Sequence, residues 1–95
     1  MEAMKETARK PRVRIIRMRN VPSMDATGMH ALTEQYNHSK KQGIVFLISD
    51  IHTQPYLALE RSGLIQMIGE ENVFRSIDEA LERAREALKG SEGKP

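Results

Sequence analysis

The chain has 95 residues, a net charge of +2 and no cysteine. This length suits one domain with a modest hydrophobic core, and the lack of cysteine excludes disulfides and thiolate metal sites. The longest apolar run, Ile44 to Ile48, is too short to span a bilayer, and no signal peptide is visible. We therefore expect a soluble, cytoplasmic domain, either free or cut from a membrane protein.

Basic residues are concentrated at the start of the chain. Residues 1–19 hold seven Lys or Arg and two Glu, whereas residues 20–95 hold eight basic and eleven acidic residues. Between 12 and 19 the arginines alternate with apolar residues, as they do on a strand with exposed edges. The four aromatic residues all lie outside this basic segment and cannot stack nucleic-acid bases there. We therefore expect no nucleic-acid partner.

The first half of the chain predicts a helix end, a strand and a long helix. Residues 1–10 are expected to be the end of a helix that stops before Pro11. Residues 12–19 predict a strand that is apolar on both faces and so lies between two layers. Asp25 is the expected N-cap of a helix that reaches about Gln42 and stops at Gly43.

The second half predicts a buried strand followed by helices. Residues 44–49 form a continuous apolar run typical of a central strand. Thr53 is expected to cap a short helix that ends before Gly63, a glycine expected in the left-handed conformation. Residues 72–74 suggest a short edge strand. A capping box is expected to begin the last helix, whose apolar stripe is Ile77, Ala80, Leu81, Ala84 and Leu88.

Strand and helix alternate, which predicts an α/β fold with a small, mostly parallel β-sheet and flanking helices. We expect one domain over residues 1–90, with a matched core at 12–88 and a disordered tail at 91–95. About three strands would leave part of the sheet uncovered, so N-terminal strands are expected to be missing. The same exposed surface favours a homodimer.

The turn between the first strand and the following helix is the first candidate site. Backbone N–H groups at a helix N-terminus lack partners and attract anions. One interpretation is a capped helix start, and the other is a docking or phosphoacceptor turn formed by Ser23, Asp25, Ala26, Thr27 and Gly28. Contacts to an anion or a nucleotide are expected from Asn20, Ser49 and His52, because the carboxyl ends of adjacent parallel strands form a ligand crevice.

Other motifs give no sign of chemistry. His30, Glu34 and His38 lie four residues apart, but the outer two would be ~12 Å apart along a helix and cannot share one ion. The sequence contains neither a nucleophile elbow nor a Walker-type phosphate loop. We therefore expect a protein that is not an enzyme and that has no catalytic residues, metal site or cofactor.

The segments RNVPSMDATGMHAL, ERSGL and IGEENVFRSIDEALE resemble the STAS domain, and most closely its branch in SulP-type (sulfate permease family) anion transporters. The resemblance runs from about Arg12 to Leu88. It implies a non-catalytic, cytosolic regulatory module at the inner face of the cell membrane. The partners it implies are the transmembrane domain of a transporter or another cytosolic protein, with a nucleotide or an anion as a ligand.

The alternative implied by the resemblance is a soluble anti-sigma-factor antagonist regulated by phosphorylation or nucleotide binding. In that branch the turn is similar to D-S-S-G, and a partner kinase phosphorylates the serine after the aspartate. Ala26 occupies that position here and Thr27 matches the next one. This departure from the pattern predicts that the turn is a constitutive docking surface.

Overall fold

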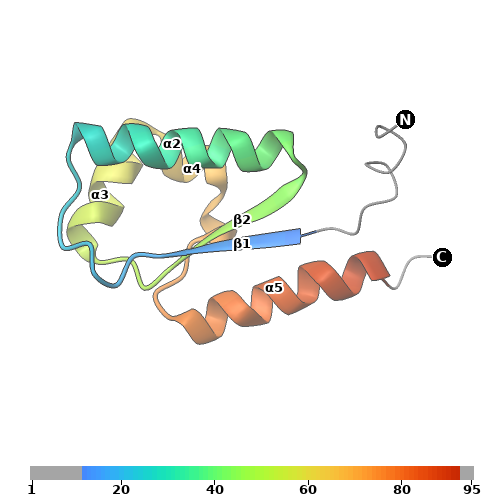
Figure 1. Ribbon diagram of the computed structural model, residues 1–95. Helices are drawn as coiled ribbons and strands as arrows, with labels where there is room; N and C mark the ends of the chain where they lie inside the picture. The colour runs from blue at the N-terminus through green and yellow to red at the C-terminus, as the bar shows by residue number, and fades with distance from the viewer. Residues whose placement is uncertain (1–11, 93–95) are drawn as a thin grey trace.

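The computed structural model describes residues 12–92, which form a two-stranded sheet and its covering helices (Figure 1). The elements are β1 (Arg12–Arg17), α2 (Ala26–Lys41), β2 (Ile44–Ser49), α3 (Thr53–Ser62), α4 (Leu64–Ile68), the 3₁₀ helix η1 (Glu70–Asn72) and α5 (Ile77–Glu92). The helix expected over residues 1–10 lies outside the described residues.

The two strands pair in parallel, in a register that runs from Arg12 opposite Ile44 to Arg17 opposite Ser49. Helix α2 lies on one face of the sheet and α5 on the other (Figure 1). Both strands therefore carry apolar side chains on two faces, and the predicted α/β class with a parallel sheet is confirmed. Strand β1 ends at Arg17, two residues earlier than predicted, because Arg19 and Asn20 form a turn.

The hydrophobic core lies mainly on the α2 side of the sheet. Its buried members come from β2, α2, α3, α4 and the end of β1: Met18, Leu32, Phe46, Ile48, Leu59, Leu64, Ile65 and Ile68. Met29 and Tyr36 of α2 pack against this cluster. The thinner layer under α5 buries Leu47, Ala80 and Ala84. Small alanines allow α5 to approach the sheet closely.

Glycines end two of the elements as predicted. Gly63 has φ 88° and its N–H donates to the carbonyls of Leu59 and Glu60, which closes α3. Gly43 has φ 72° and follows the end of α2. Leu64 comes directly after Gly63, begins α4 and is buried in the core. The left-handed backbone at Gly63 therefore turns the chain back onto the core.

Two predictions need correction, one about the start of α3 and one about a third strand. His52, not Thr53, is the N-cap of α3, because the N–H of Tyr56 donates to the carbonyl of His52 at 3.0 Å and begins the helix one residue earlier. The predicted strand at 72–74 is a single bridge between Val73 and Ile48. The preceding turn of 3₁₀ helix uses Glu70–Asn72, so little chain remains to pair.

The last helix also differs from prediction. It continues to Glu92, so the first residues of the expected disordered tail 91–95 are helical, and residues 93–95 are not described. Helix ends fray, and their limits commonly differ by one or two residues. Leu81 and Leu88 of the predicted apolar stripe are 41% and 36% exposed. Two strands are too narrow to cover the full width of this stripe.

Candidate docking site at the carboxyl end of the sheet

The predicted candidate residues lie at one end of the sheet because β1 and β2 are parallel and adjacent. The segment after β1 begins with Met18, whose N–H donates to the carbonyl of Ser49 at 2.9 Å and whose side chain is buried. This anchor holds the end of β1 beside the end of β2. The turn before α2 and the start of α3 therefore form one rim.

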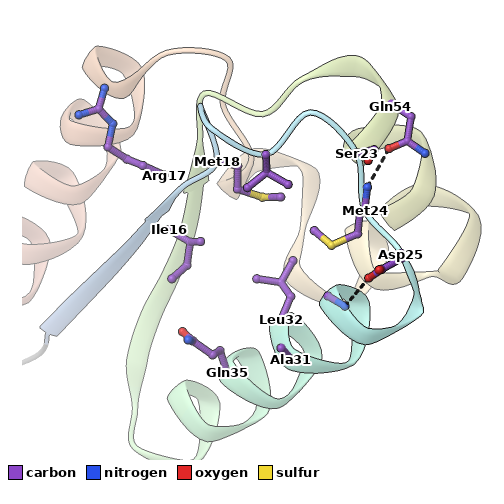
Figure 2. Close-up of a pocket in the computed structure, with 12 residues that line it drawn as sticks. Ile16, Arg17, Met18, Ser23, Met24, Asp25, Ala31, Leu32, Gln35 and Gln54 are labelled. Atoms are coloured by element: carbon purple, nitrogen blue, oxygen red, sulfur yellow. Dashed lines mark hydrogen bonds between the residues drawn. The ribbon is translucent and has the colours of Figure 1, made fainter.

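The turn from β1 is joined to the start of α3 by two hydrogen bonds. The N–H of Met24 donates to Oε1 of Gln54 at 3.0 Å, as Figure 2 shows. One ring nitrogen of His52, Nε2, lies 2.7 Å from the carbonyl oxygen of Arg19. These two hydrogen bonds hold the turn at both of its ends, at Arg19 and at Met24. Gln54 belongs to this rim, and no sequence motif had pointed to it.

Asp25 caps α2 as predicted. Its backbone is extended, and its Oδ1 accepts a hydrogen bond from the N–H of Gly28 at 2.9 Å (Figure 2). A Cβ added at Gly28 would lie 2.9 Å from the sulfur of Met24, so the absence of a side chain lets the turn lie against the helix. Asp25 and Gly28 therefore set the shape of the turn.

The remaining turn residues present their side chains to solvent. Ser23, Ala26 and Thr27 are all exposed. Thr27 does not pack inward, although it lies in the first turn of α2. The helix turns Leu32 toward the core, and Thr27 lies on a different side. Its hydroxyl is available to a partner.

The residues expected to contact an anion or a nucleotide lie at the same end but differ in access. Asn20 and His52 are exposed. Ser49 is fully buried, and its hydroxyl donates to Oδ2 of Asp50 at 3.1 Å. A ligand at the rim would meet Asn20 and His52 first, whereas Ser49 supports Asp50.

Asp50 forms an ion pair at this end, and sequence reasoning assigned it no role. It has φ 58°, a left-handed conformation that short polar residues such as Asp and Asn tolerate best. Arg17 donates from Nε to its Oδ2 at 2.9 Å, and this hydrogen bond lowers the pKa of Asp50 from its ordinary value. The chain reversal after β2 is thereby fastened to the end of β1.

Two depressions flank the rim. The first, of about 610 Å³, is an open groove between β1 and α2, where Ile16, Met18 and Leu32 form an apolar floor and Ser23 and Asp25 lie at one end (Figure 2). The second, of about 680 Å³, lies on the α3 side between His52 and Arg75. There Tyr56 donates to Glu70 Oε2 at 3.5 Å, and burial together with the negative charge of Glu70 raises the pKa of Tyr56.

The described residues show no arrangement that suggests metal chemistry. His30 and Glu34 form an exposed pair at 3.2 Å on α2. Among residues 12–92 no three His, Cys, Asp or Glu side chains are gathered as metal ligands. Within the same range, no helix is long and apolar enough to cross a membrane.

Comparison with known proteins identifies the family. The STAS domain model matches residues 1–80. The chain belongs to the STAS domain family. A crystal structure of a sulfate transporter family protein from Wolinella succinogenes is 46% identical, with a TM-score of 0.80 over 82% of this chain and 64% of that one. The STAS domain of a SulP transporter from Vibrio cholerae is 29% identical, with a TM-score of 0.79 over 93% and 73% of the two chains.

Curated relatives are much longer than this STAS chain. Sulfate transporter 1.3 of Arabidopsis thaliana is 31% identical over 83 residues, which are 85% of this chain and 13% of the transporter. Probable sulfate transporter 4.2 of the same plant is 31% identical over 68 residues, 72% of this chain and 10% of that protein. The chain is thus homologous to the STAS domains of sulfate transporters. It spans only a small part of the length of the whole transporters.

Proposed function

We propose that this chain is the cytosolic regulatory STAS domain of a SulP-type sulfate or anion transporter and performs no chemistry of its own. The observation that carries the proposal is the 46% identity, at a TM-score of 0.80, to a sulfate transporter family protein. The domain acts at the inner face of the membrane through contacts with the transmembrane part of the transporter or with another cytosolic protein.

The rim around the α2 N-terminus is the docking surface in this proposal. Ser23, Ala26 and Thr27 are exposed, while Asp25 and Gly28 fix the backbone that presents them. The two hydrogen bonds to His52 and Gln54 hold this surface in one shape before a partner arrives. A preorganised surface lowers the entropy lost on binding. The rim therefore suits constitutive docking.

A domain exchange tests the proposal. The matching region of the Wolinella sulfate transporter family protein is replaced by this chain, and sulfate uptake is measured in cells. We expect the chimera to be inserted and active, whereas a transporter without this region loses uptake. A chimera that is inserted but has the uptake of the truncated transporter would contradict the transporter assignment.

Two substitutions on α2 then test the surface. Thr27→Arg places a bulky charge on the rim, and Asn37→Arg places the same charge on an exposed position ~15 Å further along the helix. We expect Thr27→Arg to reduce uptake at least ~10-fold, the effect of ~1.4 kcal/mol of lost docking energy, and Asn37→Arg to leave uptake unchanged. Equal uptake in the two variants would contradict docking at the rim.

A soluble signalling antagonist switched by phosphate is the second candidate function. The exposed hydroxyl of Thr27 favours it, because a kinase could reach this side chain. Ala26 disfavours it, because the position that resembles the phosphoserine has no hydroxyl. Mapping phosphate on the chain by mass spectrometry separates the two functions.

A further inference from the structure

A groove between η1 and α5 is a surface feature that the proposed function does not use. It has a volume of about 420 Å³, and the surface exposed in it is mostly apolar. The lining consists of one aromatic residue, four glutamates and one arginine: Glu71, Phe74, Glu79, Glu82, Arg83 and Glu86. The groove lies near the edge of the sheet where Val73 bridges to β2, which is the edge opposite β1.

The two walls of this groove are joined by hydrogen bonds. Nε of Arg83, on α5, donates to Oδ1 of Asn72 at 3.3 Å, and Nδ2 of Asn72 donates to the carbonyl of Ile68 at 3.0 Å. The N–H of Phe74 donates to the carbonyl of Ile48 at 2.8 Å, which holds this aromatic residue beside β2. The groove is therefore formed before a partner arrives, and a preorganised surface loses less entropy on binding.

The carboxylate of Glu71 lies against the backbone of its own loop. Gly69 has φ 102°, a conformation that favours glycine. A Cβ built at Gly69 would lie 2.8 Å from Oε2 of Glu71 and 3.0 Å from its Cδ, so any larger residue there would displace this carboxylate. The glycine therefore allows Glu71 to stay in the position from which it lines the groove.

The groove is negatively charged, although the chain as a whole carries a net charge of +2. Four glutamates and one arginine line it, which gives a net charge of −3. Glu79, Glu82 and Glu86 follow one side of α5 over ~10 Å. Within residues 12–92, Arg85 pairs with Glu82 at 2.9 Å, and no cation pairs with the other three carboxylates of the groove. Uncompensated negative charge therefore surrounds a mostly apolar surface.

We propose that this groove docks a cytosolic loop of the transporter's transmembrane part that is rich in Lys and Arg and carries an apolar residue. The inference rests on the proposed function, because the cytosolic loops of membrane proteins carry an excess of Lys and Arg. The apolar side chain contacts Phe74, and the basic side chains reach the glutamates while their aliphatic stems pack on the apolar surface. The same negative charge disfavours the anionic lipids of the cytoplasmic leaflet as the occupant.

Peptide binding to the 95-residue chain tests the proposal. The probe is the peptide Gly-Lys-Arg-Leu-Arg-Lys-Gly, and the amide signals of the isotope-labelled chain are followed by NMR as the peptide is added. We expect saturable shifts at Phe74, Arg83 and Glu86 and none at Thr27 on the rim. A peptide with glutamate at its four basic positions should not bind, and one with glycine in place of leucine should bind at least ~3-fold more weakly. Shifts that are absent, or that centre on Thr27, would overturn the proposal.

Two matched glutamates locate the contact. Glu86 on α5 and Glu60 on α3 are both exposed, and only Glu86 lines the groove. Glu86→Lys and Glu60→Lys change the net charge of the chain by the same amount. We expect Glu86→Lys to weaken binding of the basic peptide at least ~3-fold more than Glu60→Lys does. Equal losses would mean that the peptide responds to the overall charge of the chain, and would overturn docking in the groove.

Salt and protein concentration identify the occupant without substitution. Binding of the basic peptide should weaken as NaCl rises from ~0.05 M to ~0.5 M, because salt screens exposed charges, and an affinity that does not depend on salt would overturn the proposal. Signals of the groove that shift with protein concentration in the absence of peptide would mean that a second copy fills it, and would also overturn the proposal. Either failure would leave the transporter assignment standing, because the domain exchange tests that separately.

Discussion

Nε of Arg17 lies 2.9 Å from Oδ2 of Asp50, and this contact joins the last residue of β1 to the first residue after β2. Asp50 is also the non-glycine residue with positive φ in the described chain. An ion pair therefore holds the one backbone position at this end that a larger side chain would strain. The pair fixes where the strands end and hence where the rim begins.

The pH dependence of stability should report this pair. The lowered pKa of Asp50 means that its charge stabilises the fold above the unfolded value near 3.8, and that this contribution is lost as pH falls through the folded pKa. Asp50→Asn keeps a residue that tolerates the left-handed backbone but removes the charge. We expect its urea midpoint to fall below that of the unaltered chain at pH 7, and the difference to shrink in acid.

Glu60→Gln is the control for this measurement, because Glu60 is an exposed carboxylate on α3. Its effect should be small at both pH values. A difference between Asp50→Asn and the unaltered chain that is the same at pH 7 and in acid would contradict the role assigned to the Asp50 charge.

The cap of α2 should contribute to stability. Asp25→Ala removes the acceptor of the Gly28 N–H and is expected to cost ~1 kcal/mol. Asp25→Asn keeps a side-chain oxygen at the same position and should lie close to the unaltered chain. Urea denaturation measures both. Equal losses for Ala and Asn would show that the carboxylate charge matters more than the capping bond.

Gly63 should resist substitution for a backbone reason alone. Nothing lies within 4 Å of a Cβ built at this position, so a side chain has room, but φ is +88°. Gly63→Val should cost ~1–2 kcal/mol through the left-handed steric penalty. Gly63→Asn should cost less, because asparagine tolerates this conformation. An unchanged denaturation midpoint for Gly63→Val would contradict the prediction.

Thr27 should be modified poorly by a kinase of the anti-sigma type. Ala26 replaces the hydroxyl at the expected position, and a phosphate on Thr27 would be repelled by the Asp25 carboxylate while gaining from the helix dipole. The chain is incubated with a lysate of its host and phosphate is mapped by mass spectrometry. Stoichiometric phosphate on Thr27 would favour the signalling function over constitutive docking.

The sequence predicted the sheet and most helix limits because these depend on short-range signals. The apolar run Ile44–Ser49, the Asp25 cap and the glycine at 63 each act within a few residues. The exposure of Leu81 could not be predicted in the same way. Whether an apolar helix position is covered depends on how wide the underlying sheet is, which is a tertiary property.

The candidate rim was predicted in part for a similar reason. Parallel pairing of two adjacent strands brings Asp25 and His52 to one end, and this pairing follows from the alternation of strands and helices. The side chains of Gln54 and Asp50 make long-range hydrogen bonds, to the backbone N–H of Met24 and to the side chain of Arg17, and these have no sequence signature. The exposure of Thr27 likewise depends on how α2 is rotated against the core.

Two hydrogen bonds connect the turn before α2 to the start of α3, so the two parts of the rim are joined to each other. A partner that displaces Met24 would pull on Gln54, and one that displaces the carbonyl of Arg19 would pull on His52. Helix α3 leads through Gly63 into α4, whose Leu64 and Ile65 are buried in the core, so α3 connects the turn to the core. A partner bound to the turn therefore also contacts, through these hydrogen bonds, the half of the domain that α3 and α4 form.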